Sequence, residues 1–150
     1  MPPMRSITAM EHLIRLFETR PLIALHLSAA LLALGVGAVV LARRKGTASH
    51  KALGWFWTVL MFATALSSVF IRDYRLPNLA GYTPIHFFTV STALGLPWAI
   101  VQIRRGHVDA HRRMMRGLFV GGCVIAGMFA LLPGRFLGSL VWKHMLGLVA

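Results

Sequence analysis

The sequence predicts an all-α fold, a polytopic membrane bundle of four helices that run up, down, up and down. Hydrophobic residues make up 57% of the 150 residues and charged residues only 13%, whereas soluble domains usually carry about 25% charged residues. Four apolar runs are each long enough to cross about 30 Å of hydrocarbon as a helix. The runs also lack the two-residue alternation of a membrane β-barrel.

Each apolar run ends where charged or turn-forming residues begin. Arg43 and Arg72 follow the first and second runs, Arg104 follows the third, and Pro133 follows the fourth. Charged side chains are unfavourable in hydrocarbon, so these residues mark the membrane boundaries. The expected helices cover residues 21–42, 52–71, 82–103 and 114–132, within a four-helix domain over residues 21–135.

Two shorter segments flank the four-helix domain. In residues 1–20, apolar side chains recur at helical spacing, which predicts a short amphipathic helix in the membrane interface. These side chains are Met4, Ile7, Met10, Ile14 and Phe17. Residues 136–150 are expected to form a second interfacial segment or to extend the fourth helix.

The chain is strongly basic, with 16 Lys and Arg residues against 4 Asp and Glu and a formal net charge of +12. A nucleic-acid-binding protein would carry its basic residues on a soluble face. Here they form short clusters between apolar runs, which indicates anionic membrane lipids as partners and not nucleic acid. The loops after the first and third runs hold the densest clusters. The positive-inside rule therefore places these loops in the cytoplasm and both termini on the opposite side.

The single cysteine and the tryptophans have simple expected roles. Cys123 has no partner for a disulfide within the chain and lies in an apolar run, so we expect a small packing residue. The tryptophans lie near the ends of the expected spans, which predicts a belt at the membrane–water interfaces. They are Trp55, Trp57, Trp98 and Trp142.

Four of the seven histidines fall at two matched depths. His26 lies about five residues into the first run and His86 about four residues into the third, both counted from the outer side. His50 and His111 stand just before the second and fourth runs, on the inner side. Ionisable residues in membrane spans usually serve a function, so these four form two candidate pairs, one near each membrane face.

Paired histidines on alternate helices suit haem b, whose iron takes two axial imidazoles. Alternate helices lie diagonally across a four-helix bundle, so His26 with His86, and His50 with His111, could each bind one haem. The hypothesis is a membrane electron carrier with one or two haems. It would oxidise a quinol or a small reductant at one face and reduce a respiratory membrane partner or a metal at the other.

Basic residues near each pair are candidates to bind the haem propionates. Arg72 and Arg75 are placed for an outer haem. Lys51, Arg112 and Arg113 are placed for an inner one. The simpler interpretation is that these side chains bind lipid phosphates.

The residues leave other functions open. A single metal ion at the outer pair is one, and a site made of histidine alone suits copper or zinc. A non-enzymatic assembly or stability factor for a respiratory complex is another, with the bundle as a docking surface. A small-solute transporter would need a polar path, and the spans contain few hydroxyl side chains. No catalytic residue is assigned, because the sequence contains no hydrolase motif or pair of carboxylates.

Several segments resemble a family of bacterial four-helix membrane proteins known as domain of unknown function 2306. Besides His26, they are KGTASHKALGWFW with His50, SSVFIRDY, TPIHFFTVSTALGLP with His86, AHRRMMRGLFVGG with His111, and AGMFALLPGR. Together they cover about residues 22 to 136. The resemblance implies a multi-pass protein of the bacterial inner membrane, with both termini in the periplasm on the charge argument above.

A more distant similarity is to the diheme transmembrane cytochromes b, which carry electrons from ascorbate or quinol. In that family four core helices each donate one histidine, paired first with third and second with fourth. The order and sides of His26, His50, His86 and His111 are similar, which implies haem ligation by the same two pairs. The sequence between the histidines differs from that family, and so does the pattern expected at an ascorbate site.

Overall fold

The computed structural model describes residues 9–72, 80, 83–132, 136–139 and 141–142 of the chain. The regular secondary structure of these residues is helical throughout, which confirms the all-α prediction. The elements are α1 (Ala9–Thr19), α2 (Pro21–Ala42), α3 (Ala48–Phe70), α4 (His86–Arg104), α5 (Val108–Phe119), the π-helix η1 (Val120–Ile125), α6 (Ala126–Ala130) and α7 (Phe136–Ser139).

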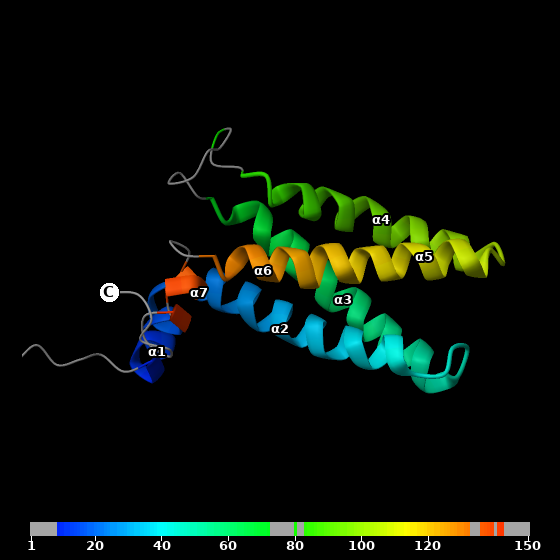
Figure 1. Ribbon diagram of the computed structural model, residues 1–150, viewed down its shortest axis with the longest axis horizontal. Coiled ribbons are helices and arrows are strands. Elements are labelled where there is room, and N and C mark those ends of the chain that lie inside the picture. The colour runs from blue at the N-terminus through cyan, green and yellow to red at the C-terminus, as the bar shows by residue number, and fades with distance from the viewer. Residues whose placement is uncertain (1–8, 73–79, 81–82, 133–135, 140, 143–150) are drawn as a thin grey trace, which may run out of the picture.

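Four helical rods are long and apolar enough to cross a membrane, as predicted. Helices α2, α3 and α4 each form one rod, and α5, η1 and α6 together form the fourth, Val108–Ala130. Figure 1 shows the rods running alongside one another, with α1 and α7 together at one end, here called the terminal end. The opposite end is called the basic end because of its nine Lys and Arg residues, Arg43, Arg44, Lys45, Lys51, Arg104, Arg105, Arg112, Arg113 and Arg116.

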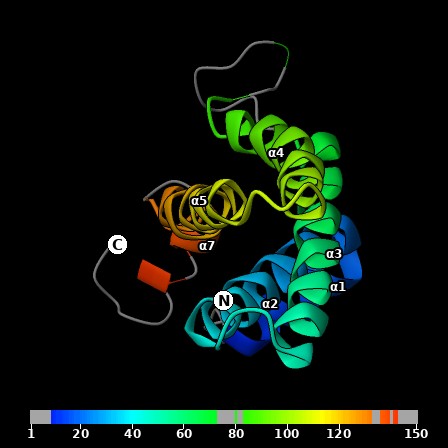
Figure 2. The same cartoon turned by 90° about the vertical axis from the view of Figure 1, so that its right-hand side faces the viewer.

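Alternate rods lie across the bundle from one another. Helix α3 packs against both α2 and α4, α4 packs against α5, and η1 contacts both α2 and α4. The end-on view in Figure 2 shows α2, α3, α4 and α5 following one another around the bundle. The first and third rods are therefore diagonal to each other, and so are the second and fourth.

The second rod begins earlier than predicted. Helix α3 starts at Ala48 instead of residue 52, because Thr47 caps it: the Thr47 Oγ1 accepts the backbone N–H of His50 at 3.2 Å. A side-chain oxygen before the first turn satisfies one of the backbone donors that have no partner within the helix. His50 is thus a residue of the helix and not of the preceding loop.

The third and fourth rods also start at other residues than predicted. The fourth rod begins at Val108, two residues after Gly106. Gly106 has a φ of +81°, which glycine adopts without strain and which suits a tight turn. His111 therefore lies one turn inside a helix. Helix α4 begins only at His86, which is its first residue and not one turn inside as predicted.

Trp57 occupies the centre of the contact between α2 and α3. Its side chain is 2% exposed, and its Nε1 donates to the backbone carbonyl of Ala33 at 2.9 Å. Gly37 makes room for the indole, since a Cβ there would lie 2.5 Å from the Trp57 Nε1. The prediction that Trp57 belongs to the interfacial belt is wrong; Trp55 and Trp98, by contrast, are exposed.

The fourth rod contains a π-helix that the sequence analysis does not predict. Within it Cys123 is buried, and its thiol donates to the Met61 Sδ at 3.4 Å. Gly122 faces the same side chain, because a Cβ there would lie 2.8 Å from the Met61 methyl group. Cys123 is thus a packing residue, as expected.

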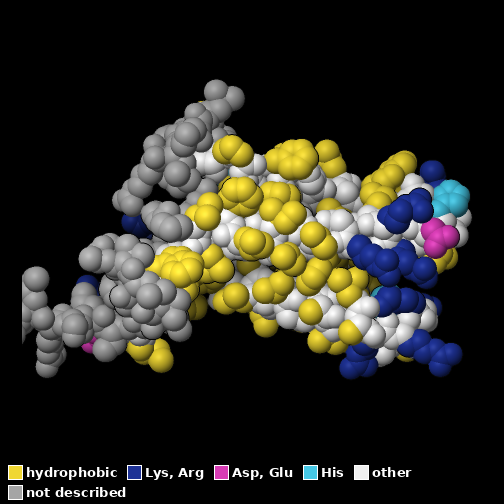
Figure 3. Space-filling model, in the orientation of Figure 1, with side chains coloured by type: hydrophobic (Ala, Val, Ile, Leu, Met, Phe, Trp, Pro, Cys, Tyr) yellow, Lys and Arg dark blue, Asp and Glu magenta, His cyan; other side chains and the backbone are white. Residues whose placement is uncertain are grey.

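The lateral surface of the bundle is apolar on every rod. Leu31, Val59, Leu94 and Met128, one from each rod, are all more than 60% exposed. Figure 3 shows hydrophobic side chains along the middle of the bundle and Lys and Arg at one end. Soluble monomers rarely expose apolar patches larger than a few hundred Å². The rods therefore have lipid as their solvent, which agrees with their length.

The glycines of α2 provide a test of this packing. Gly37→Ala should destabilise the protein by about 1–3 kcal/mol, because the added methyl group overpacks the contact with Trp57. The free energy of unfolding, measured by titration with sodium dodecyl sulfate, checks the prediction. Gly35→Ala is the matched control, since a Cβ at Gly35 meets nothing within 4 Å, and its effect should stay within about 1 kcal/mol. Equal effects of the two variants would contradict the proposed packing.

Candidate functional site

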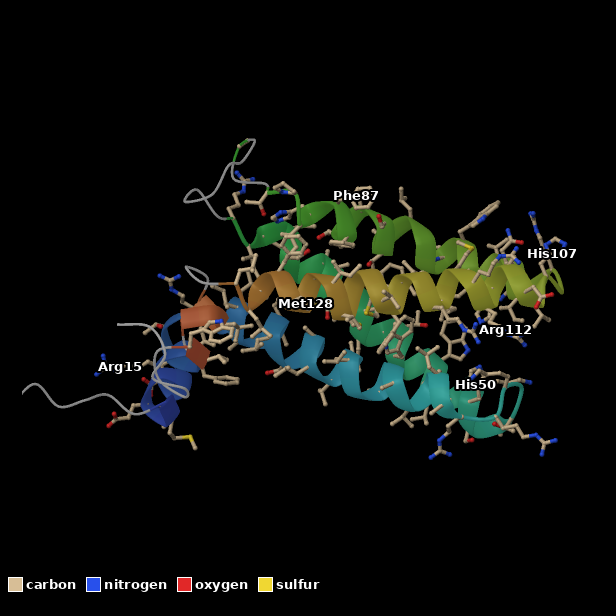
Figure 4. The ribbon with its side chains drawn as sticks, in the orientation of Figure 1. Arg15, His50, Phe87, His107, Arg112 and Met128 are labelled. Carbon is tan, nitrogen blue, oxygen red and sulfur yellow. The ribbon has the colours of Figure 1, made fainter. Side chains whose placement is uncertain are left out.

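The four candidate histidines lie at two levels of the bundle. His26 and His86 lie toward the terminal end, and His50 and His111 lie toward the basic end, where Figure 4 labels His50 and Arg112. Within each pair the two imidazoles are close enough to interact electrostatically. The fold therefore places His26 and His86, and likewise His50 and His111, at matching levels of diagonally placed rods.

His26 is bonded to the end of α3. Its Nδ1 lies 2.9 Å from the Oγ of Ser67, and that hydroxyl lies 2.7 Å from the backbone carbonyl of Ala63, to which it donates. A hydroxyl has one proton to donate, so Ser67 accepts a hydrogen bond from the His26 Nδ1–H. The neutral ring of His26 then keeps its lone pair on Nε2.

Both ring nitrogens of His86 are bonded to the backbone. Its Nδ1 accepts the N–H of Thr83 at 3.2 Å. Its Nε2 lies 3.3 Å from the carbonyl oxygen of Ser68 and 3.2 Å from that of Ile71, and donates to them. These carbonyls lie at the C-terminus of α3, where helical donors run out. His86 therefore caps α3 with the first residue of α4, and its ring keeps no lone pair for a metal ion.

His50 carries a buried nitrogen atom with no hydrogen bond. Its Nδ1 is the one buried side-chain nitrogen or oxygen without a partner in the described part of the chain. The backbone carbonyl of Val40, near the end of α2, lies close to the ring. An unsatisfied buried polar atom costs about 1–3 kcal/mol, so such an atom in a native structure calls for an explanation. A bound ligand is one.

One ring nitrogen of His111 is hydrogen-bonded, and the other carries the lone pair of the neutral ring. Its Nδ1 lies 2.9 Å from the backbone carbonyl of Ala99 in α4. A carbonyl only accepts, so Nδ1 carries the proton and Nε2 carries the lone pair. Metal-binding histidines commonly donate their second ring N–H to a backbone carbonyl in this way, which fixes the ring orientation.

The two arginines assigned to the cofactor lie one at each end. Arg112 follows His111 on α5, is exposed, and forms an ion pair with Asp109 at 3.6 Å. An exposed pair of this kind contributes little, so Asp109 holds Arg112 weakly. Arg72 is exposed and follows Ile71, whose carbonyl meets His86. Of the other candidates, Lys51 and Arg113 are exposed and adjacent to the inner pair in the sequence, and Arg75 lies outside the described residues.

Two apolar grooves lie on the bundle surface. One, of about 310 Å³, is lined by residues of α2 and by Leu53; the other, of about 270 Å³, lies between α4 and the fourth rod. Neither groove is lined by any of the four histidines. Within the described ranges, no three His, Cys, Asp or Glu side chains come together to bind a metal ion. Each candidate site thus consists of two imidazoles without a third side-chain ligand of these types.

A family described as "Predicted membrane protein (DUF2306)" matches residues 23–132, nearly three quarters of the chain. The chain belongs to this DUF2306 family. The matched segment contains all four candidate histidines and almost the whole of the four rods. No curated protein and no solved structure matches the chain, so the similarity to diheme cytochromes b stays a prediction.

In this DUF2306 protein, most hydrogen-bond partners of the histidines are backbone groups, which residue types do not reveal. The carbonyls of Ala99, Ser68 and Ile71 are examples. One signal was available: Thr83 stands three residues before His86, a spacing typical of side-chain caps at the start of a helix. That spacing indicates a structural role for His86 in addition to the predicted role as a haem ligand.

The capping role of His86 predicts a specific loss of stability. His86→Phe should lower the free energy of unfolding by about 1–3 kcal/mol, because the partly buried carbonyl of Ile71 loses a donor, whereas that of Ser68 keeps the backbone N–H of Ile71. Titration with sodium dodecyl sulfate measures the change. His107→Phe is the control: His107 is exposed and bonds only the nearby Gln102 side chain through Nδ1, so its effect should stay within about 0.5 kcal/mol. A His86 variant as stable as the control would rule out the cap.

Proposed function

We propose that this DUF2306 protein is a membrane electron carrier that binds haem b between His50 and His111. The observation that carries the proposal is the pair of imidazoles at the basic end, where the buried His50 Nδ1 has no partner. When bound, the haem supplies a one-electron redox centre. The residues of the chain bind it, orient it and exclude water from it.

The number of protein ligands favours haem over a free metal ion. Structural zinc takes four protein ligands and catalytic zinc three. The described residues offer two imidazoles at each level and no cluster of three candidate ligands. A haem iron already has four porphyrin nitrogens and needs two axial ligands, which is what a pair of histidines provides.

The hydrogen bonds of the inner pair suit ligation. The Ala99 carbonyl fixes the proton of His111 on Nδ1 and leaves the Nε2 lone pair available. In this proposal the unsatisfied Nδ1 of His50 provides the second lone pair. Gly54, one turn along α3 from His50, has nothing within 4 Å of its Cβ position, so the helix surface there has room for a flat ring.

Charge at the basic end favours a haem at this level. Lys51 and Arg112 directly follow His50 and His111, and both are exposed. In this proposal they pair with the two propionates, and Arg113 adds a third cation. On the same argument, Arg72 would serve a second haem at the outer pair.

A second haem at His26 and His86 is the weaker part of the proposal. Ligation there requires His86 to release the carbonyls of Ser68 and Ile71, and the His26 ring lies close to the backbone carbonyl of Thr64 as well as to Ser67. From the residues alone, the alternative of a single metal ion lies at the outer pair. The hydrogen bonds favour the inner pair, and we assign the first haem to it.

The proposed orientation places the basic end in the cytoplasm and α1 and α7 on the periplasmic side of a bacterial inner membrane, because positive residues concentrate on cytoplasmic loops. A quinol or a small reductant would then be oxidised at one face. A respiratory membrane partner or a metal would be reduced at the other. The alternative, an assembly factor for a respiratory complex, needs no bound cofactor.

Visible spectroscopy of the purified protein tests this function. Protein from haem-replete cells should show a Soret band and, after dithionite reduction, sharp α and β bands. His50→Ala and His111→Ala should each lose the same haem, measured as the pyridine-haemochrome ratio per chain. His107→Ala is the matched control and should keep the full ratio, because His107 lies exposed in the α4–α5 turn.

Three results would overturn the assignment. A colourless preparation without bound metal by elemental analysis would favour the assembly factor. Full haem content in both the His50 and His111 variants would reject the inner pair. Loss of haem in His26→Ala and His86→Ala, but not in the inner variants, would move the single haem to the terminal end.

A further inference from the structure

The basic end combines a dense positive charge with an adjoining apolar groove. All nine of its Lys and Arg side chains are exposed, and Asp109 is the one acidic residue among them. Figure 3 shows these side chains gathered beyond the apolar middle of the bundle. One carboxylate can neutralise only one of nine cations, so this end needs anions from its surroundings.

Two of these cations follow the helix that forms most of the groove of about 310 Å³. Arg43 and Arg44 follow the last residue of α2, and the groove of about 310 Å³ runs along α2 up to Val39, one turn before Arg43. Its lining residues are Leu31, Leu32, Gly35, Val36, Val39 and Leu53. At 1.5 Å per residue, Arg43 stands about 6 Å beyond Val39 along the helix axis.

Lys45 is already engaged by the protein. Its Nζ donates to the backbone carbonyls of Val40 and Arg43, at 3.4 and 2.8 Å, and to that of Leu41. These carbonyls belong to the end of α2, which Lys45 caps. Arg43 and Arg44 are therefore the cations that remain to bind an anion at this end of the groove.

We propose that this site binds an anionic phospholipid, with one acyl chain in the α2 groove and its phosphate between Arg43 and Arg44. An apolar groove that ends in cations at the height of the headgroups is complementary to such a lipid, which is apolar along its tails and negative at its head. An acidic protein or a nucleic acid would use the arginines and leave the groove empty. The site is independent of the haem proposed above.

The groove has room because of Gly35. A Cβ at Gly35 meets nothing within 4 Å, so a larger side chain there would enter the groove without touching the bundle core. The opposite end of the bundle provides a charge control. Arg15 and Arg20 are also exposed, but Glu11 and Glu18 accompany them.

Native mass spectrometry of the detergent-purified protein tests the site with two added lipids of equal chain length, phosphatidylglycerol and phosphatidylcholine. Phosphatidylglycerol should bind more tightly, on the order of tenfold, because each cation near an anionic headgroup contributes about 1 kcal/mol. The double variant Arg43→Gln/Arg44→Gln should lose this preference, and Arg15→Gln/Arg20→Gln should keep it. Gly35→Phe should weaken the binding of both lipids, since the ring occupies the acyl-chain groove.

Several outcomes would overturn the proposal. Equal binding of the two lipids would show that the site does not select an anionic headgroup. The same loss of preference in the Arg15/Arg20 variant would leave only general electrostatic attraction. Unchanged lipid binding by Gly35→Phe would show that the groove is not occupied. Displacement of phosphatidylglycerol by polyglutamate or by a DNA duplex at equal charge concentration would favour an acidic partner. Protein purified from haem-deficient cells should give the same lipid preference, so failure here is distinguishable from failure of the haem assignment.

Discussion

The hydrogen bond from the Trp57 indole to the Ala33 carbonyl is the contact on which the bundle geometry depends. It joins α2 to α3 at the centre of the core, and it requires the close approach that Gly37 permits. Phe119 of the fourth rod reaches the same place, within 2.7 Å of the Cβ position of Gly37. Three of the four rods therefore meet around one glycine, and both histidine pairs lie at fixed distances along the bundle from that point.

The two histidine pairs differ in their hydrogen bonds to the helices. At the terminal end, His86 is bonded through both nitrogens and closes the junction of α3 and α4, which the Ser68–Thr89 hydroxyl contact at 2.7 Å reinforces. At the basic end, the His50 Nδ1 has no partner among the described residues, and His111 bonds the Ala99 carbonyl through Nδ1. The outer pair is thus bonded mainly to α3, and our proposal assigns ligand binding to the inner pair.

Most of the fold could be predicted from hydropathy, because the membrane restricts the structures that a long apolar segment can form. Twenty apolar residues between charged ends can satisfy their backbone in hydrocarbon only as a helix or within a closed barrel, so the four rods were predictable from residue types. The first rod matches its predicted range, 21–42. The starts of the other rods depended on local contacts, such as the Thr47 cap and the turn at Gly106, which hydropathy does not contain.

The matching levels of the histidines were predictable, but their hydrogen bonds were not. Equal depth on alternate helices follows from counting residues, whereas the direction of a ring depends on helix rotation and on carbonyls such as that of Ala99. Trp57 illustrates the same limit. Its position near a span end suggested the interface, but its side of the helix faces the core.

The π-helix η1 divides the fourth rod into two segments with different helical phase. Because the α-helix turns about 100° per residue, the wider turn of η1 offsets the faces of α6 from those of α5. The side of α5 that presents His111 to the bundle therefore does not continue as the same side of α6. The residues of α6 that face lipid, such as the exposed Met128, therefore cannot be found by extending the periodicity of α5 past Ile125.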